Sequence, residues 1–129
     1  MSLYFTIATA NNILPDVIRK YEIVLQKRNA VIEIEQHIDT NINIEIFVKL
    51  KQKLNYALTE LYSAISDLEN IGVVIKSIDD GLVDFPSKHF SDDVWLCWKY
   101  GETQIKFWHE KNIGFSGRKP ICVNDETLV

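Results

Sequence analysis

The chain has 129 residues, of which 47% are hydrophobic and 25% charged, with only five glycines and three prolines. We predict a single domain over residues 1–129, because this length and composition suit one hydrophobic core and exclude collagen-like, low-complexity and disordered chains. A net charge of -4 gives no positive field for nucleic-acid phosphates or an anionic membrane. Neither nucleic acid nor membrane is therefore an expected partner.

The start of the chain lacks the basic region of a secretory signal, and no stretch approaches the roughly 18 apolar residues of a membrane helix. A cytoplasmic location is expected. Two cysteines, Cys97 and Cys122, are too few for a disulfide framework. In a reducing compartment we expect both to be buried apolar fillers.

Residues 7–71 are predicted to form a long antiparallel helical hairpin. Thr6 suits the N-cap of a short turn through Ile13, and Pro15 suits the first position of a new helix, where its missing N–H is not needed. A wide apolar stripe carries this helix to about Ile38. The stripe consists of Leu14, Val17, Ile18, Tyr21, Val24, Leu25, Val31, Ile32 and Ile38.

The second helix of the hairpin shows an unbroken heptad spacing, which is typical of a coiled-coil seam. Gly72 follows it, at the place where a left-handed residue ends a helix. At 1.5 Å per residue this helix would be about 40 Å long, too long for a chain of this size to cover alone, so we expect a partner copy. The seam residues are Phe47, Leu50, Leu54, Ala57, Leu61, Ala64, Leu68 and Ile71.

Residues 31–47 leave a second interpretation open. Isoleucines there alternate with polar residues as they would in a half-buried β-hairpin. The same isoleucines also satisfy helical spacing, and the periodic segments on both sides are helical. Helix is therefore favoured, with a β-hairpin as the alternative.

Residues 73–123 are predicted to form a small antiparallel β unit, because the apolar pattern changes to alternation after Gly72. A turn at residues 79–81 leads to a strand at residues 82–85, which Pro86 is expected to end. Two aromatic strands and a glycine-rich tail follow.

The two aromatic strands, residues 94–99 and 104–109, are joined by residues 100–103. A two-residue Gly-Glu turn and a four-residue loop would both give the same strand register, with Trp98 opposite Ile105. Side chains that alternate along each strand then divide between the two faces of the sheet. One face would carry Val94, Leu96, Trp98, Ile105, Phe107 and His109, and the other Trp95, Cys97, Lys99, Gln104, Lys106 and Trp108.

Four side chains able to bind a metal, Asp84, His89, Cys97 and His109, lie in one short segment, and they raise the hypothesis of a zinc site. The predicted register argues against it, because Cys97 and His109 fall on opposite faces. The favoured interpretation is a buried thiol and a histidine hydrogen-bonded at a sheet edge. No metal and no other cofactor is therefore expected.

Cys97 would need a nearby base to act as a nucleophile, and its predicted cross-strand neighbour is Lys106, which would lower the pKa of the thiol. A packing role is favoured, since two tryptophans flank this cysteine. The face predicted to carry both Trp95 and Trp108 suits a partner or a flat ligand, although a covering by the helical hairpin is favoured.

The tail at residues 114–120 contains two glycines, which let backbone N–H groups approach an anion, and the cations Arg118 and Lys119. The alternative is a plain loop in which Arg118 pairs with Asp84 or Glu102. His109 leads into this loop and has chemistry suited to general acid–base work, but no catalytic residue is assigned. The candidate ligand-binding residues are Asp84, Glu102, Trp108, His109 and Arg118.

Three ordered motifs stand in the β unit: Gly81-Leu82-Val83-Asp84-Phe85-Pro86, then Leu96-Cys97-Trp98-Lys99-x-Gly101-Glu102-x-x-Ile105-x-Phe107-Trp108-His109, then Gly114-Phe115-x-Gly117-Arg118-x-Pro120-Ile121. Together with Phe5-Thr6, Ala10-Asn11 and Leu14-Pro15, they resemble the uncharacterised prokaryotic domain of unknown function 2203 family. The sequence departs from that family at residues 87–93, where an alanine and a Gly-Arg pair are frequent, and at Lys99, where arginine is usual. The resemblance implies a helical hairpin followed by a small β unit and transfers no activity.

The predicted fold class is therefore α+β, a long antiparallel helical hairpin followed by a small antiparallel β unit. The leading functional hypothesis is a non-enzymatic binding or scaffold module that forms a homo-oligomer, a dimer, through its helices. The rival hypothesis is a small enzyme or a sensor of a small anionic ligand, with a pocket around His109 and the loop from Gly114 to Arg118.

Overall fold

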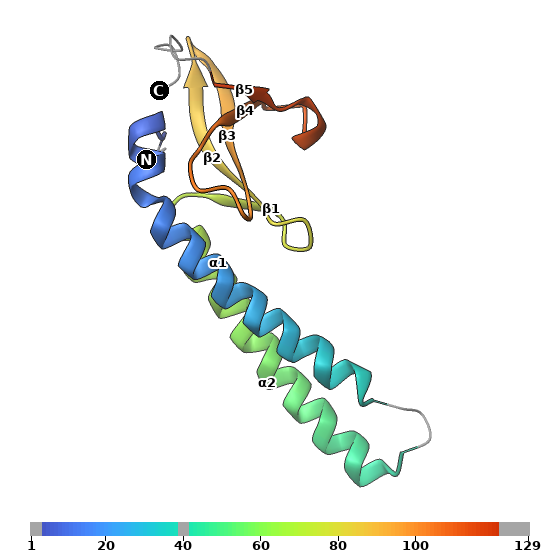
Figure 1. Cartoon of the computed structure of the whole chain (residues 1–129). Helices are drawn as coiled ribbons and strands as arrows, with labels where there is room; N and C mark the ends of the chain where they lie inside the picture. The colour runs from blue at the N-terminus through green and yellow to red at the C-terminus, as the bar shows by residue number, and fades with distance from the viewer. Residues whose placement is uncertain (1–3, 39–41, 122–129) are drawn as a thin grey trace. The chain divides into compact units, whose positions relative to one another are not determined.

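The computed structural model describes residues 4–38 and 42–121 and confirms the α+β class (Figure 1). Two long helices are followed by one antiparallel sheet. The elements are α1 (Ile7–Gln36), α2 (Ile44–Glu69), β1 (Val74–Ser77), β2 (Leu82–His89), β3 (Asp92–Lys99), β4 (Phe107–Glu110), the 3-10 turn η1 (Phe115–Gly117) and β5 (Lys119–Pro120). Within residues 31–47 the described residues form the end of α1, the start of α2 and irregular connections next to them, and they contain no strand, so the favoured helical interpretation was correct over the β-hairpin.

The chain divides into two compact units. One comprises residues 19–68, and the other comprises residues 1–18 and 69–129. That residues 1–129 fold as one domain stays a prediction.

The unit of residues 19–68 is a two-helix hairpin whose apolar seam is buried in its second half. Seven of its side chains lie in the core: Tyr21, Val24 and Val31 from α1, and Ala57, Leu61, Ala64 and Leu68 from α2. The predicted seam residues from Ala57 to Leu68 are therefore buried, and Ile71, the last of them, is half-buried. The first seam residues are less covered, since Leu50 and Leu54 are half-buried and Phe47 is exposed. A coiled coil stays a prediction.

The N-terminus of α1 forms as predicted at Thr6, but Pro15 does not start a new helix. The Thr6 hydroxyl accepts a hydrogen bond from the Thr9 N–H at 3.0 Å, as an N-cap does. Pro15 lies inside α1, where it removes one intrahelical hydrogen bond. Leu14 and Val17 beside it are fully buried, so packing holds the helix together across the proline.

The five strands follow one another in the sheet in chain order, and all are antiparallel. Gly72 and Gly81, with φ of 111° and 69°, make the turns before and after β1, as their left-handed conformations require. The prediction that Pro86 ends a strand was wrong, because β2 continues to His89. The Pro86 carbonyl accepts the Phe5 N–H along the edge of β2 that is turned away from β3. In an extended strand the N–H and C=O of one residue point to the same edge, so the missing N–H of Pro86 costs no hydrogen bond with β3.

The predicted register of the aromatic hairpin was wrong by one residue. Leu96 pairs with Trp108 and Trp95 with His109, instead of Trp98 with Ile105. The link between the strands is longer than predicted, because the Ile105 N–H leaves the ladder and donates to the Asn11 side chain at 2.7 Å. A slip of one residue moves every β4 side chain to the other face of the sheet.

The inner face of the sheet packs on the start of the chain. The rings of Phe5 and Phe85 meet edge to face at 5.2 Å between centroids. The Ser87 hydroxyl donates to the Phe5 carbonyl at 2.7 Å. Because Val83, Phe85, Leu96 and Trp98 are all buried, this layer is the core that fixes the sheet.

Asn11→Ala tests the link between α1 and the turn before β4. The Asn11 amide also donates to the Ile7 carbonyl at 3.1 Å, so the change removes two hydrogen bonds and leaves a partly buried N–H without its acceptor. We expect a loss of about 1–3 kcal/mol in the free energy of unfolding, measured by urea denaturation. Asn12→Ala, at an exposed neighbour on α1, is the control and should change little.

Candidate functional site

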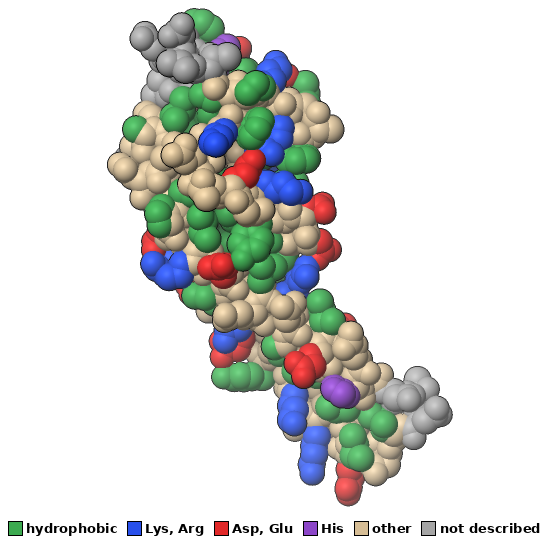
Figure 2. Space-filling model, viewed as in Figure 1, with side chains coloured by type: hydrophobic (Ala, Val, Ile, Leu, Met, Phe, Trp, Pro, Cys, Tyr) green, Lys and Arg blue, Asp and Glu red, His purple; other side chains and the backbone are tan. Residues whose placement is uncertain are grey.

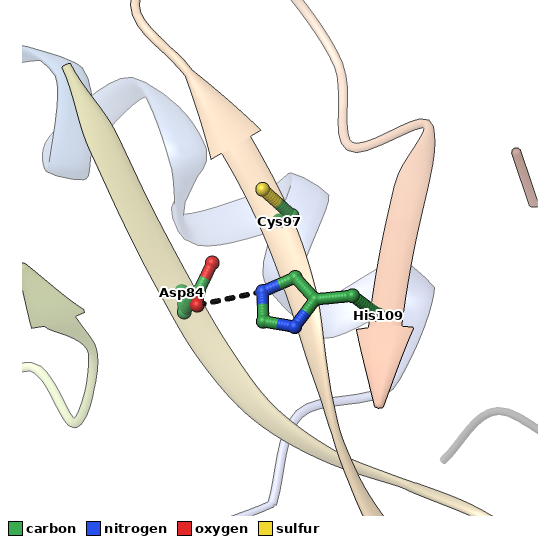
Figure 3. A group of neighbouring side chains, drawn as sticks. All are labelled: Asp84, Cys97 and His109. Atoms are coloured by element: carbon green, nitrogen blue, oxygen red, sulfur yellow. Dashed lines mark hydrogen bonds and ion pairs between the residues drawn. The ribbon is translucent and has the colours of Figure 1, made fainter. Parts of the chain in front are cut away.

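Three buried polar side chains meet on the outer face of the sheet (Figure 3). Asp84 comes from β2, Cys97 from the second half of β3, and His109 from β4, and their exposed fractions are 1%, 1% and 4%. Asp84 pairs directly with Cys97 across the β2–β3 ladder. The ring of His109 reaches over β3, so that its Nε2 lies 2.8 Å from Asp84 Oδ2.

The predicted placement of Cys97 and His109 on opposite faces was therefore wrong. The ligating atoms of Asp84, Cys97 and His109 all lie within 4.8 Å of one another. In the observed register these three side chains share one face of the sheet, so they stay candidate metal ligands. His89, the fourth candidate ligand, points to the other face and stacks on Trp108 with 4.8 Å between ring centroids.

One proton is shared between His109 and Asp84. The other ring nitrogen of His109, Nδ1, lies 2.9 Å from the Glu110 carbonyl oxygen. A carbonyl only accepts, so we assign a hydrogen to Nδ1. The contact between Nε2 and Oδ2 then holds one further proton, and the pair has no net charge whether it is an ion pair or a neutral pair.

The carboxyl group of Asp84 is only half satisfied. Its Oδ1 is buried without a hydrogen-bond partner, which is unusual because buried polar atoms in native proteins are nearly always paired. Burial raises the pKa of Asp84 above its ordinary value, and His109, Cys97 and Lys76 offset part of that rise. A bare carboxylate is therefore unfavourable here unless a proton or a cation accompanies it.

Cys97 is a protonated thiol at neutral pH in the free protein. Burial, and next the charge of Asp84, raise its pKa to about 12. Its predicted neighbour Lys106 is not there, since the cross-strand partner on β4 is Phe107. The nearest base, His109 Nε2, is engaged by Asp84 at 2.8 Å, so the protonated thiol is not set up as a nucleophile.

A cavity of about 210 Å³ opens over these three side chains. Its rim contains two lysines, Lys76 from β1 and Lys111 after β4, and the amide side chain of Asn112. Sequence reasoning missed these three residues, although the step from His109 directly into a loop was a signal for the last two. The loop that was predicted to bind an anion does line the cavity, through Gly114 and Phe115.

Arg118 and Glu102 form a separate ion pair. One guanidinium nitrogen of Arg118 lies 2.8 and 2.9 Å from the two carboxylate oxygens of Glu102 and 3.3 Å from the Cys97 carbonyl. The guanidinium also stacks on Phe107, 3.8 Å from the ring centroid. Glu102 in turn accepts the Lys99 N–H at 2.7 Å. Arg118 is thus tied into the loop, as the alternative interpretation predicted, and it does not line the cavity.

The candidate residues therefore fall into three places. Asp84 and His109 form the floor of the cavity, Glu102 and Arg118 hold the loop, and Trp108 lies with Leu96 on the inner face of the sheet. The prediction that Trp95 and Trp108 share one face was wrong, for the same reason of register. Trp95 lies on the outer face, where the Lys76 ammonium sits 4.1 Å from its ring centroid.

Comparison with known proteins gives a family and no activity. The family model described as uncharacterized conserved protein (DUF2203) matches residues 3–121. No curated protein and no solved structure matches the chain.

Removing the Arg118 side chain should destabilise the protein and leave the lining of the cavity unchanged, because Arg118 does not line it. Arg118 and Glu102 side chains are 13% and 23% exposed, between the exposed pairs that contribute about 0–1 kcal/mol and the buried pairs whose disruption costs about 3–5 kcal/mol. We expect Arg118→Ala to lower the free energy of unfolding by about 2 kcal/mol, measured by thermal or urea denaturation. The matched change Lys106→Ala, at an exposed cation of the same β unit, should have an effect near zero.

Proposed function

The chain belongs to the DUF2203 family of uncharacterized conserved proteins, and we propose that it is a non-enzymatic binding protein that holds a small anionic ligand in the cavity above Asp84 and His109. The single observation that carries this proposal is the cavity itself, with a buried polar floor and a basic rim.

The charge around the cavity supports an anion. The Asp84–His109 pair shares one proton and adds no net charge, and Lys76 and Lys111 place two cations at the rim. Lys111 also lies 3.8 Å from the Asp93 carboxylate, so Lys76 is the main positive charge at the opening. Asn112 offers an amide N–H beside them. A small carboxylate or phosphate finds there both charge and hydrogen-bond donors.

The size of the cavity limits the ligand. Drug-sized ligands occupy pockets of roughly 300–1,000 Å³, and this cavity has about 210 Å³. The proposed ligand is therefore smaller than a drug-sized molecule, such as a short carboxylic acid or a phosphate group. A reaction is not part of the proposal, because Cys97 is protonated and His109 has both ring nitrogens engaged.

We do not include nucleic acid or membrane among the proposed partners. Basic and acidic side chains are mixed on the face shown in Figure 2, without a large patch of one sign. None of the helices in residues 4–38 and 42–121 is long and apolar enough to cross a membrane. A cytoplasmic location is kept as part of the proposal.

Anion binding is tested by thermal denaturation in the presence of a chelator, with acetate, oxalate, phosphate and sulfate as probes. A ligand at about a hundred times its Kd adds about 2.7 kcal/mol of stability, which raises Tm by several degrees in a domain of this size. We expect at least one probe to do so. The Lys76→Ala and Lys111→Ala variants should each bind that probe about tenfold more weakly.

Lys106→Ala is the control, since it removes a cation that does not line the cavity. If no probe raises Tm, or if the probe acts equally on Lys106→Ala and on the two rim variants, the cavity is not an anion site.

Self-association through the helices is a second proposal, supported by the far end of the hairpin. Ile44, Ile46 and Val48 are 76%, 47% and 47% exposed, and Ile32 on α1 is 40% exposed. Ile44 and Val48 lie one turn apart on the same face of α2 with Phe47, which is 37% exposed, and an exposed apolar face of this kind is typical of a surface that another protein covers. A second copy of the chain suits it, because the heptad spacing continues through Leu50 and Leu54, which one hairpin leaves half-buried.

Ile44→Glu combined with Val48→Glu tests the dimer. The two positions are four residues apart and lie on the same face of α2, so the charges should prevent association without disturbing the intrahelical hydrogen bonds. In analytical ultracentrifugation at micromolar concentration we expect a dimer for the natural chain and a monomer for the variant. Tyr62→Glu, at a residue of α2 that is 64% exposed, should stay dimeric. A natural chain that sediments as a monomer would rule the dimer out.

A further inference from the structure

We propose that Asp84, Cys97 and His109 bind a divalent transition-metal ion, with Zn²⁺ as the best-suited ion, at the floor of the cavity. The inference rests on the proposed function in that both place a ligand in this cavity. It adds a resident ion and a named set of ligands.

The donor set is one that zinc prefers. A thiolate, an imidazole nitrogen and a carboxylate oxygen are its usual protein ligands, and sites that bind a further molecule use three protein ligands and keep the fourth position open. Here the three donors come from three neighbouring strands and lie within 4.8 Å of one another. Ligands of a tetrahedral zinc ion are roughly 3.5 Å apart, given bond lengths of about 2.0–2.3 Å, so shifts of about 1 Å in the side chains would close the site.

The orientation of His109 is the second observation. Ligating histidines usually donate their other ring N–H to a carboxylate or a backbone carbonyl, which fixes the ring and the tautomer. The contact of Nδ1 with the Glu110 carbonyl at 2.9 Å does this, and it directs Nε2 toward Asp84 and Cys97.

The unpartnered oxygen of Asp84 is the third observation. Oδ1 is buried without a hydrogen-bond partner, on a side chain that is 1% exposed and belongs to the lining of the same cavity. A metal ion would satisfy it directly. The Cys97 thiol, which also acts on the Asp84 carboxyl, would itself become a ligand of the ion.

The exchange is balanced in charge. In the free protein the Asp84–His109 pair and the Cys97 thiol are both neutral. Binding of Zn²⁺ releases the proton shared by that pair and the proton of the thiol, so that a carboxylate and a thiolate neutralise the two charges of the ion. Two protons leave and the buried site stays neutral, which avoids the cost of burying an uncompensated charge.

The open fourth position would point into the cavity, toward the rim with Lys76 and Lys111. A small anion bound there would be both a metal ligand and a partner of the lysines. This gives the proposed anion a specific anchor at the floor of the cavity.

Cobalt substitution tests the site on the full chain. The chelator-treated protein is titrated with Co²⁺ alone and then with Zn²⁺, in buffer without coordinating anions. We expect one Co²⁺ per chain, with a thiolate-to-cobalt charge-transfer band in the near ultraviolet and visible bands of a four-coordinate ion, and displacement of both by Zn²⁺. Calorimetry in buffers of different ionisation enthalpy should report about two protons released per ion.

Asp84→Asn is the decisive variant. Its amide can still donate to His109 Nε2, so folding, checked by circular dichroism, is retained while the anionic ligand is lost. We expect metal affinity to fall by more than about a hundredfold, and Cys97→Ala to abolish the charge-transfer band. His89→Ala is the matched control, because it removes an imidazole on the other face of the sheet, and it should bind as the natural chain does. Cys122 lies outside the described residues.

The idea is overturned if the natural chain takes up no stoichiometric Co²⁺, or if Asp84→Asn and Cys97→Ala bind it unchanged. The proposed function fails separately. If anions stabilise the protein in chelator and Co²⁺ does not bind, the metal site is wrong and the anion pocket stands. If Co²⁺ binds and no anion changes the stability, the metal site stands and the anion pocket is wrong.

Discussion

The pairing of Leu96 with Trp108 is the constraint on which the polar cluster depends. With this register the ring of His109 lies on the outer face beside Cys97 and reaches Asp84, whereas a slip of one residue would carry it to the apolar inner face. Burial of Trp108 and Leu96 on the inner face makes that slip costly. The packing of one face thus determines the chemistry of the other.

Asp84 and Glu102, two acids of the β unit that are buried or half-buried, differ in how fully their carboxylate oxygens are hydrogen-bonded. Glu102 is fully engaged, because Arg118 and the Lys99 N–H occupy its oxygens. Asp84 has one oxygen on His109 and the other without a partner. Removing one member of a buried pair is strongly unfavourable, so both arrangements constrain the sequence. Only the second leaves bonding capacity for a ligand, which is why the loop ion pair is structural and the Asp84 cluster is the candidate site.

The two units support different proposals. The β unit has a closed apolar layer on its inner face and a small polar cavity on its outer face, as a ligand-binding module requires. The hairpin has only two helices, and its far end exposes isoleucines and a valine. In a hairpin of only two helices the seam residues Leu50 and Leu54 stay half-buried. An apolar surface of another protein, packed against the hairpin, is the simplest way to cover them.

Periodicity in the sequence was sufficient for the helices, for the turns at Gly72 and Gly81 and for the antiparallel β unit, because these depend on local spacing and on glycine conformations. The resemblance to the DUF2203 family was also visible in its motifs. The register of β3 and β4 was decided only in the tertiary structure, where the Asn11 side chain takes the Ile105 N–H and lengthens the link. Asn11 lies 94 residues from Ile105, and no local pattern encodes such a bond. For that reason the sequence contained Asp84, Cys97 and His109 as candidates, but only the folded chain placed them together.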